Sequence, residues 1–353
     1  MCLPDGEGRT DRQDNRVTPT IRDVARVAGV GKSSVSRYLN GEQHALSNSL
    51  KARIAHAIEQ LNYRPNPVAR SLRNGQTRLL GLILADIANP YSLGLIQGIE
   101  SVCQQRGFTL LLGNSANSAE QMQRYLTFFA SYRVQGLLLH PPAIALSPQP
   151  TSPLPDLPHV IIDRYMAQTA GDFVGLDNQL AMQQACAHLY SQHYDALLFL
   201  SEPIAHISSR SERWQSFQQI TARYPTRLAQ CAQVEREDNN ALDMLLYDFY
   251  QQQRAARRRG AILVANGALT QQVTLALLRL GLRWGHELGL LGFDDAEWYR
   301  LATPTISAIR QPTMQIGILA AERLIQRLNG DLSDFCEQRC LPELIIRQST
   351  CSN

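Results

Sequence analysis

The feature that most constrains this chain is a long alternation of apolar strand patterns and amphipathic helix patterns that begins after Thr77. Such alternation is typical of parallel sheets covered by helices, which predicts an α/β fold class. About 275 residues of it exceed one ordinary sheet, so two doubly wound lobes are expected. The expected strands are Leu79–Ala85, Thr109–Gly113, Val134–His140, His159–Asp163, Ala196–Ser201, Ala261–Ala265 and Leu288–Phe293, and the expected helices cover 91–106, 118–131, 178–192, 210–223, 239–255, 268–280 and 312–328.

The charge of the chain is distributed unevenly. The 353 residues carry a formal net charge of +3, but residues 1–75 hold 12 Lys+Arg against 7 Asp+Glu, while the remainder holds 22 against 24. A small basic module on a near-neutral body indicates an anionic partner at one end. Residues 1–19 mix charges with few apolar groups, so we expect a disordered arm.

Other parts of the composition exclude whole classes of protein. No apolar run is long enough for a membrane span, and residues 1–19 lack the apolar segment of a secretory signal, so a cytoplasmic protein without membrane contact is expected. The seven cysteines are odd in number and include no C-x-x-C pair. Neither a disulfide framework nor a metal site is therefore expected, and no cofactor is indicated.

Three short helical patterns precede the alternation. The first extends from Thr20 to Gly29, the second from about Lys32 to Asn40, and the third begins after Ser47. Thr20 and Ser47 are good N-caps, and Gly29 is a good helix terminator. The three helices together predict a compact module with a marginal core.

The first two of these helices, joined by a glycine-containing turn, are arranged as in modules that place a recognition helix in the major groove of DNA. The outward residues of the second helix are expected to be Lys32, Ser33, Ser36 and Arg37. An arginine there can donate two hydrogen bonds to a guanine edge. The alternative is an ordinary solvated helical hairpin. A phosphate-binding loop over 29–33 is rejected, because a helix precedes it and Arg26 stands where that loop requires glycine.

Residues 64–75 form a linker with one short helical pattern that Asn66 can cap. Two helical turns are not stable alone in water, so we expect this segment to order only when something binds it. Leu72, flanked by Arg70 and Arg73, suits insertion between base pairs in the minor groove. The alternative is that Leu72 packs on the larger domain.

The chain from Thr20 to Gly41 resembles the lac-repressor/galactose-repressor family of bacterial transcription regulators. The resemblance continues through Leu61–Leu72 and in later blocks, namely Asp86–Tyr91, Ile162–Arg164, Leu263–Asn266 and Leu291–Asp295. It implies a helix-turn-helix DNA-binding domain at 20–63, a hinge helix at 64–75 and a two-lobed, periplasmic-binding-protein-like effector and dimerisation domain at 76–353. Because the family's chain crosses three times between lobes, lobe 1 is expected near 76–176 and 310–336, and lobe 2 near 177–309 and 337–353.

The same resemblance assigns candidate DNA contacts, and the hinge residue that it aligns with the family's intercalating side chain is Leu72. Two departures weaken the cap of the recognition helix slightly: Gly31 stands where the family usually has Ser, and Ser34 where it usually has Thr. The candidate DNA-binding residues are Thr20, Arg22, Lys32, Ser33, Ser34, Ser36, Arg37, Asn40, Asn66, Ala69, Arg70, Leu72 and Arg73.

A ligand site is expected in the α/β part, because open parallel sheets bind ligands at the carboxyl ends of their strands. Acids and amides beside an aromatic face suit a carbohydrate, and Arg213 matches the family's effector-binding arginine. Gly267 stands where the family commonly has Asp. For any single residue, helix capping is the alternative, and the eight histidines are expected to be unrelated surface or pocket residues. The candidate effector residues are Asn89, Tyr91, Asp163, Arg164, Arg213, Asn266, Asp294 and Trp298.

Two arginines in that set, Arg164 and Arg213, favour a sugar acid or related polyhydroxy carboxylate, because guanidinium groups bind carboxylates with matching geometry. The runs Phe293–Trp298 and Ile309–Pro312 are similar to the ketogluconate and ketodeoxygluconate regulators of the family. The expected protein is a homodimeric repressor that binds double-stranded operator DNA under the control of a small sugar or sugar-acid effector.

Two alternatives come from other classes. A sugar-binding receptor without DNA recognition would carry a signal peptide, and a sugar kinase or dehydrogenase would need a glycine-rich phosphate loop. The sequence offers neither feature.

Overall fold

The computed structural model describes residues 19–39, 41–42, 44, 46–64, 77–142, 156–166, 170–235 and 238–351. The chain divides into two compact units, one up to Thr77 and one from Arg78 onward. We call them the helical unit and the α/β unit. The expected arm at 1–19 lies almost wholly outside the described residues.

The helical unit contains α1 (Ile21–Ala28), α2 (Lys32–Leu39) and α3 (Asn48–Gln60). The backbone nitrogen of Thr20 donates to the Asp23 carboxylate at 2.9 Å, which stabilises the start of α1. Gly29 ends α1 with φ of 62°, a left-handed conformation that favours glycine. The small core of the unit is formed around Val24, Val35 and Ile54, which are fully buried.

One expectation for this unit is wrong. Ser36 was expected on the outward face of α2, but it is only 8% exposed, whereas Lys32, Ser33 and Arg37 are exposed. The reason is that α2 packs against both α1 and α3. The sequence pattern marks only Val35 and its helical neighbours as the buried face of α2. Because two helices pack against α2, the buried face is wider and includes Ser36.

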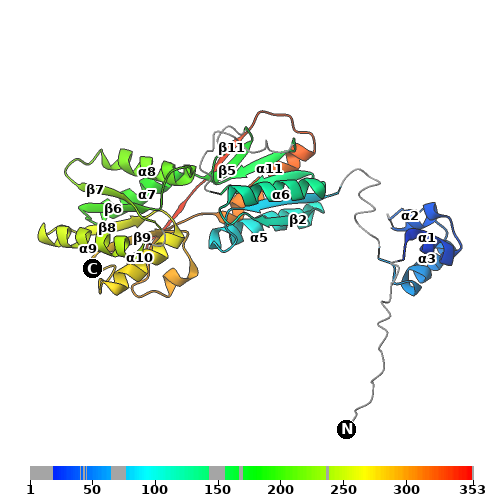
Figure 1. Cartoon of the computed structure of the whole chain (residues 1–353), viewed down its shortest axis with the longest axis horizontal. Helices are drawn as coiled ribbons and strands as arrows, with labels where there is room; N and C mark the ends of the chain where they lie inside the picture. Colours follow the sequence, from blue (N-terminus) through cyan, green and yellow to red (C-terminus); the bar gives the residue numbers. More distant parts are fainter. Residues whose placement is uncertain are drawn as a thin grey trace, which may run out of the picture. The chain divides into compact units, whose positions relative to one another are not determined.

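The α/β unit consists of two lobes, each built on a six-stranded sheet (Figure 1). The strand order is β11-β5-β4-β3-β1-β2 in lobe 1 and β12-β10-β9-β8-β6-β7 in lobe 2, and every pairing is parallel except that of β10 with β12. The strands are β1 Leu79–Leu84, β2 Thr109–Asn114, β3 Gly136–Leu139, β4 His159–Ile162, β5 Asp172–Leu176, β6 Ala196–Ser201, β7 Leu228–Gln233, β8 Gly260–Val264, β9 Gly289–Phe293, β10 Ser307–Arg310, β11 Glu337–Cys340 and β12 Glu343–Ile345.

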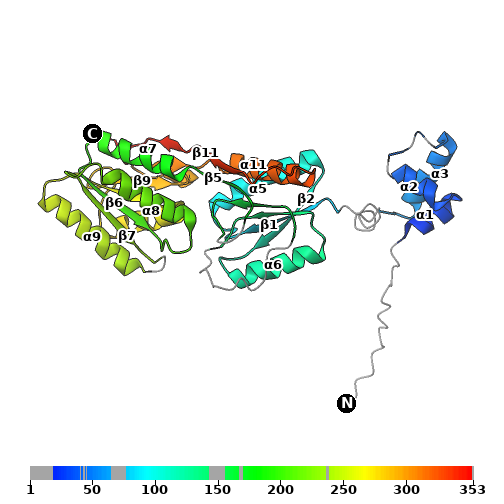
Figure 2. The ribbon, with the colours of Figure 1, turned by 90° about the horizontal axis from the view of Figure 1, so that it is seen from above.

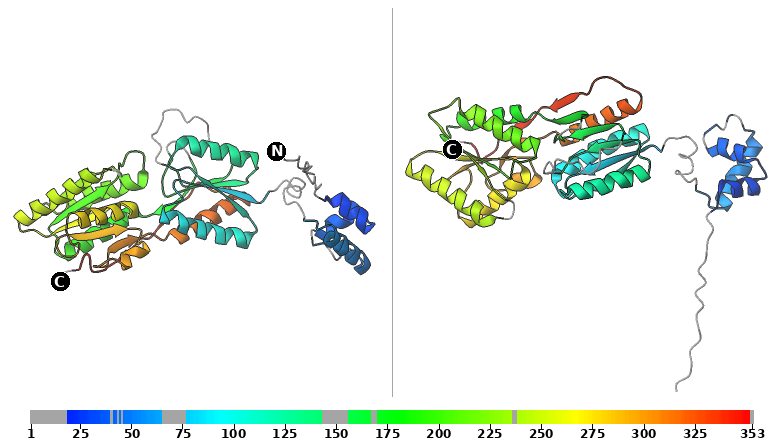
Figure 3. Two further views of the ribbon diagram at one scale, coloured as in Figure 1. Left: turned by 60° about the horizontal axis from the view of Figure 1, so that its bottom comes forward. Right: turned by 45° about the horizontal axis from the view of Figure 1, so that its top comes forward.

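Helices cover both faces of each sheet (Figure 3). Their positions follow the helical patterns of the sequence closely, which confirms the predicted fold class. They are α5 Pro90–Arg106, α6 Ala119–Ser131 and α11 Thr313–Leu328 in lobe 1, and α7 Asn178–Ser191, α8 Ser208–Thr221, α9 Asn239–Ala255 and α10 Gly267–Arg279 in lobe 2, where the short 3-10 helix η2 Glu297–Arg300 follows β9. No helix of the described residues is both long and apolar enough to span a membrane.

In lobe 1, α5 and α11 lie side by side although they are far apart in sequence (Figure 2). Glycines allow the two backbones to approach. A Cβ at Gly98 would collide with the backbone oxygen of Met314, and a Cβ at Gly317 would collide with that of Leu95. α11, which the chain forms after it returns from lobe 2, is thereby fixed against α5, the first helix of lobe 1.

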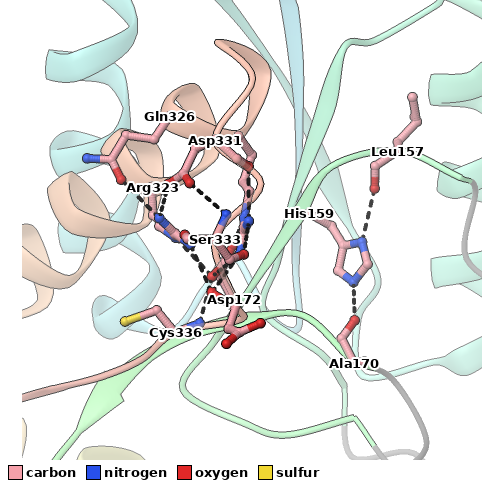
Figure 4. A network of polar contacts seen from close by, with 11 residues as sticks. Leu157, His159, Ala170, Asp172, Arg323, Gln326, Asp331, Ser333 and Cys336 are labelled. Carbon is pink, nitrogen blue, oxygen red and sulfur yellow. Dashed lines mark hydrogen bonds and ion pairs between the residues drawn. The ribbon is translucent and has the colours of Figure 1, made fainter.

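The expected end of lobe 1 at residue 336 is too early, because the short strand β11 (Glu337–Cys340) also belongs to lobe 1. β11 pairs in parallel with β5 and therefore belongs to lobe 1. A buried carboxylate holds it there: Asp172 accepts a hydrogen bond from the Cys336 nitrogen at 2.9 Å and from Arg327 Nε at 2.7 Å, and Arg323 Nε lies 2.9 Å away (Figure 4). The sequence pattern missed β11 because Glu337–Cys340 is polar and mostly exposed.

Other strands were also not expected from the sequence. β5, β7, β10 and β12 are short or of mixed polarity, and β7 has no fully buried residue. Hydropathy alone therefore does not distinguish them from loops. The corresponding residues acquire their strand conformation through pairing with the central strands.

Candidate functional site

The candidate site is a cluster of polar side chains where the two lobes meet. Lobe 1 contributes Tyr91 from the first turn of α5, His140 directly after β3, and Asp163 and Arg164 directly after β4. Lobe 2 contributes Arg213 from α8 and Asp294 directly after β9, and further residues described below. Most of these groups lie at the carboxyl ends of parallel strands, where such sheets bind ligands.

In lobe 1 the cluster is centred on the Asp163 carboxylate, which is 8% exposed. Its Oδ2 atom lies 3.5 Å from His140 Nε2 and 3.5 Å from Arg164 Nε. Burial alone would raise the pKa of Asp163, but His140 and the positive charges of Arg164 and Arg213 outweigh burial and hold that pKa well below its usual range. Asp163 is therefore ionised.

Several polar atoms on this side of the cluster are buried without a hydrogen-bond partner: Tyr91 Oη, both ring nitrogens of His140, Asp163 Oδ1 and Arg164 Nε. The 3.5 Å contacts around Asp163 are electrostatic and do not satisfy these atoms. Leaving one buried polar group unpaired costs about 1–3 kcal/mol, so a concentration of five such atoms is unusual. The arrangement indicates a surface that is completed by a ligand.

The polar groups that lobe 2 contributes to the cluster, Arg213 and Asp294, are paired. Arg213 is 3% exposed; its Nε donates to Asn178 Oδ1 at 2.8 Å, its Nη1 donates to the Ala265 oxygen at 2.6 Å, and its Nη2 lies 3.4 Å from Gln311 Oε1. The guanidinium also stacks on the Phe293 ring at 4.2 Å. Burial lowers the pKa of Arg213, while the charges of Asp163 and Asp294 act in the opposite direction.

Asp294 is held by donors from two elements. Gly267, the first residue of α10, donates its backbone nitrogen to Asp294 Oδ2 at 2.8 Å, and the Gln311 amide donates to Oδ1. A Cβ at position 267 would lie 2.9 Å from Asp294 Oδ2. The glycine that departs from the family pattern thus leaves room for the close approach of this carboxylate.

Arg213 is connected to lobe 1 through a chain of hydrogen bonds. Asn178 accepts from Arg213 and donates to Glu212 Oε2 at 2.7 Å. Glu212 in turn binds Arg339 of β11 through two hydrogen bonds, at 2.9 and 3.0 Å. The position of the Arg213 side chain is consequently coupled to the contact between the lobes.

The structure brings five of the eight candidate effector residues into mutual electrostatic contact. The phenol of Tyr91 is influenced by Asp163 and Arg164 of lobe 1 and by Arg213 and Asp294 of lobe 2, and burial raises its pKa. These five residues therefore lie in one cluster of interacting charges.

The other three candidates have structural contacts. Asn89 caps α5 by accepting from the Tyr91 nitrogen, and Asn266 caps α10 and donates to Glu202. Trp298 packs edge-to-face on Tyr299 and against the core of lobe 2. For the two asparagines the alternative of helix capping is realised.

Sequence reasoning missed His140, Asn178 and Gln311. His140 ends an expected strand, which is the position where parallel sheets bind ligands, but no sequence pattern distinguishes it from the other histidines. Gln311 follows β10, which the sequence pattern did not reveal. Asn178 begins a helix, so only its contact with Arg213 distinguishes it from an ordinary first-turn residue.

In the helical unit, the side chains of Lys32, Ser33 and Arg37 on α2 and of Arg22 on α1 are exposed, and Ser34 is half-buried. Thr20 is exposed and hydrogen bonded to Asp23. Asn40 and the candidate hinge residues Asn66, Ala69, Arg70, Leu72 and Arg73 lie outside the described residues.

Comparisons with known proteins agree with this geometry. Residues 20–66 match the family of bacterial regulatory proteins, lacI family, and residues 186–350 match the periplasmic binding protein-like domain. The HTH-type transcriptional regulator PtxS of Pseudomonas putida is 39% identical over 335 residues, which is 94% of this chain and 96% of that protein. The HTH-type transcriptional regulator KdgR of Bacillus subtilis is 34% identical over 88% of this chain and 92% of that protein.

Among solved structures, the lac repressor dimer bound to operator and the anti-inducer ONPF superposes with a TM-score of 0.78. It is 22% identical and covers 95% of this chain and 99% of that chain, and at this identity the likeness supports the fold alone. Taken together, the helix-turn-helix unit, the two-lobed α/β unit and the full-length relatives show that the chain belongs to the LacI family of bacterial regulatory proteins and is a DNA-binding transcription regulator.

Proposed function

We propose that this regulator is a homodimeric repressor of carbohydrate or sugar-acid catabolic genes, and that a polyhydroxy carboxylate binds between its two lobes to control its affinity for operator DNA. The observation that carries the proposal is the buried cluster at the lobe contact, which combines two guanidinium groups with unpaired hydrogen-bonding atoms. Guanidinium groups suit a carboxylate, and the neighbouring acids accept hydrogen bonds from hydroxyl groups.

Arg213 is the principal anchor for the carboxylate in this proposal. Its Nε and Nη1 atoms are held by Asn178 and Ala265, whereas its contact with Gln311, at 3.4 Å, is long and easily replaced by a ligand oxygen. Because the guanidinium is already fixed by its partners and by the Phe293 ring, little side-chain entropy is lost on binding. Asp163, Arg164, Tyr91 and Asp294 supply the remaining contacts.

The DNA side of the proposal rests on the helical unit. In this proposal α2 enters the major groove of one half-site with its exposed Lys32, Ser33 and Arg37, and Thr20, Arg22 and Ser34 contact the DNA backbone or neighbouring bases. The segment 64–75, with Asn66, Ala69, Arg70, Leu72 and Arg73, forms the hinge helix on DNA, and Leu72 inserts into the minor groove.

Three considerations support a dimer. One helix-turn-helix module contacts too few bases for useful specificity, and proteins with two-fold symmetry bind two-fold operators. In lobe 2, Leu275 and Leu278 on α10 and Leu301 after η2 are 48%, 60% and 82% exposed, which provides apolar surface for a second copy. A lac repressor structure with the same fold is a dimer bound to operator.

The test is to titrate the protein–operator complex with gluconate-type acids and with neutral hexoses, and to repeat it with Arg213→Ala. We expect a sugar acid to change operator affinity in the wild type. Arg213→Ala should lose on the order of a hundredfold in effector affinity, because it removes a buried charged partner, while operator affinity without effector stays within a few-fold. Calorimetry that shows tight binding of a neutral hexose and none of the acids, or normal effector binding by Arg213→Ala, would contradict the proposal.

A further inference from the structure

The positive and negative side chains of the site balance one another. The two guanidinium groups of the cluster, Arg164 and Arg213, are matched by two carboxylates, Asp163 and Asp294. The nearby pairs Arg210–Glu202 and Arg339–Glu212 cancel within themselves. The described residues of the cluster thus offer a ligand no surplus positive charge, although a buried, uncompensated carboxylate is strongly unfavourable.

One group of the cluster can change this balance. His140 is 2% exposed, and both of its ring nitrogens lack a hydrogen-bond partner. Its Nε2 atom lies 3.5 Å from Asp163, and its ring lies beside that of Tyr91, with 5.4 Å between ring centroids. Burial lowers the pKa of His140, and Arg164 acts in the same direction, whereas Asp163 opposes it. Without a ligand, His140 is therefore uncharged near neutral pH.

The groups that face His140 come from several elements. Asp163 and Arg164 follow β4, Tyr91 belongs to α5, and Asp86 follows β1 and exerts a weaker electrostatic influence. From lobe 2, Ser209 lies 3.4 Å from Asp163 Oδ2, and Arg213 acts on the same carboxylate. Asp86 adds a further negative charge near the imidazole, and a bound carboxylate would add another. Both charges raise the pKa of His140 and so favour its protonation.

We propose that His140 takes up one proton when a carboxylate effector binds, so that the imidazolium supplies the positive charge that the cluster lacks. The proton moves from the buffer to an imidazole nitrogen, and no other covalent bond changes. His140 then discriminates acids from neutral sugars, because a neutral sugar carries no negative charge that would raise the pKa of the imidazole. This inference rests on the proposed function, since it assumes a carboxylate ligand between the lobes.

The direction of the pH effect follows from the linkage between binding and protonation. Carboxylate binding raises the proton affinity of His140, so the protonated form binds the acid more tightly. Between the pKa of free His140 and that of bound His140, the dissociation constant for the acid should rise about tenfold per pH unit. Binding of a neutral sugar, if it occurs, should not follow this slope.

The experiment is titration calorimetry of the full chain with 2-keto-D-gluconate and D-gluconate at pH 7.5, in buffers that differ in ionisation enthalpy. We expect an uptake of about one proton per site for the acid that binds. His140→Gln retains hydrogen-bonding capacity but cannot become charged, so it should bind the acid more weakly at pH 6.5 than the wild type and show no proton uptake. His286→Gln, at an exposed histidine, is the matched control and should behave as the wild type.

The outcomes separate this inference from the proposed function. Tight acid binding with no proton uptake, or with an uptake that persists in His140→Gln, would overturn the role of His140 and leave a carboxylate effector in place. Binding of D-glucose without binding of either acid would overturn both proposals. Loss of acid binding in His140→Gln with an unchanged melting temperature, together with normal behaviour of His286→Gln, would support the role of His140 and exclude a failure to fold.

Discussion

Lobe 1 and lobe 2 share one sheet plan but differ in how their facing polar groups are satisfied. In lobe 2, Arg213, Asp294 and Asn266 are all hydrogen bonded within the protein. In lobe 1, Tyr91 and His140 have buried polar atoms without a partner. The facing groups of lobe 2 are therefore organised within the protein, whereas those of lobe 1 leave hydrogen-bonding atoms available to the proposed ligand.

The lobes also differ in how their helices pack. In lobe 1 the backbones of α5 and α11 approach through glycines, and α11 enters lobe 1 from the β10 crossing. Of the unpaired polar groups of lobe 1, Tyr91 lies on this helix pair, in the first turn of α5, whereas His140 and Asp163 follow strands of the sheet. Close helix packing in lobe 1 thus stands beside a polar surface whose hydrogen bonding is incomplete.

The largest effect should come from breaking the helix pair. Gly98→Ala places a Cβ against the Met314 backbone oxygen, which cannot move aside without displacing α11, so we expect a loss of about 3 kcal/mol in the free energy of unfolding. Denaturant unfolding of the full chain measures this loss. Gln97→Ala, on the exposed side of the same helix, is the control and should change stability by less than about 0.5 kcal/mol. Similar values for the two variants would show that close helix contact does not stabilise lobe 1.

A smaller effect tests whether lobe 2 is organised in advance. Asn178→Ala removes the acceptor that holds Arg213 Nε, so effector affinity should fall about 30-fold, which corresponds to about 2 kcal/mol for a hydrogen bond to a charged group. Calorimetry with the effector measures it.

The matched control for Asn178 is Asn239→Ala. Asn239 also begins a helix directly after a capping aspartate, Asp238, but it is exposed. If Asn239→Ala weakened effector binding as much as Asn178→Ala, the loss would reflect a general effect on helix starts and not the position of Arg213.

The smallest effect compares two buried tyrosines directly. Tyr91→Phe removes an unpaired hydroxyl from lobe 1 and should stabilise the ligand-free protein by about 1 kcal/mol while weakening effector binding. Tyr299→Phe removes a hydroxyl that donates to the Phe293 oxygen at 2.7 Å in lobe 2, and should cost about 1 kcal/mol. Melting curves with and without effector test both. A stability change of the same sign in the two variants would remove the distinction between the lobes.

Much of the fold could be predicted from the sequence because its strongest patterns are local. The α-helices formed by the described residues of the α/β unit and its central strands follow apolar periodicity, and Thr20 and Gly29 mark the ends of α1 through their capping chemistry. The edge strand β11 could not be predicted, since its residues carry no apolar pattern and pair with β5 only because Asp172 fixes the Cys336 backbone.

The candidate site could be predicted only in part. The sequence by itself determined that acids, amides and arginines follow the strands, and its motifs determined the LacI family, because both are properties of residues close together in the chain. Only the tertiary structure decided that Arg213 is fixed by Asn178 and that His140 lies unpaired beside Asp163. These contacts join residues from different elements. In the second case the packed lobes bury the imidazole, and this burial lowers the pKa of His140.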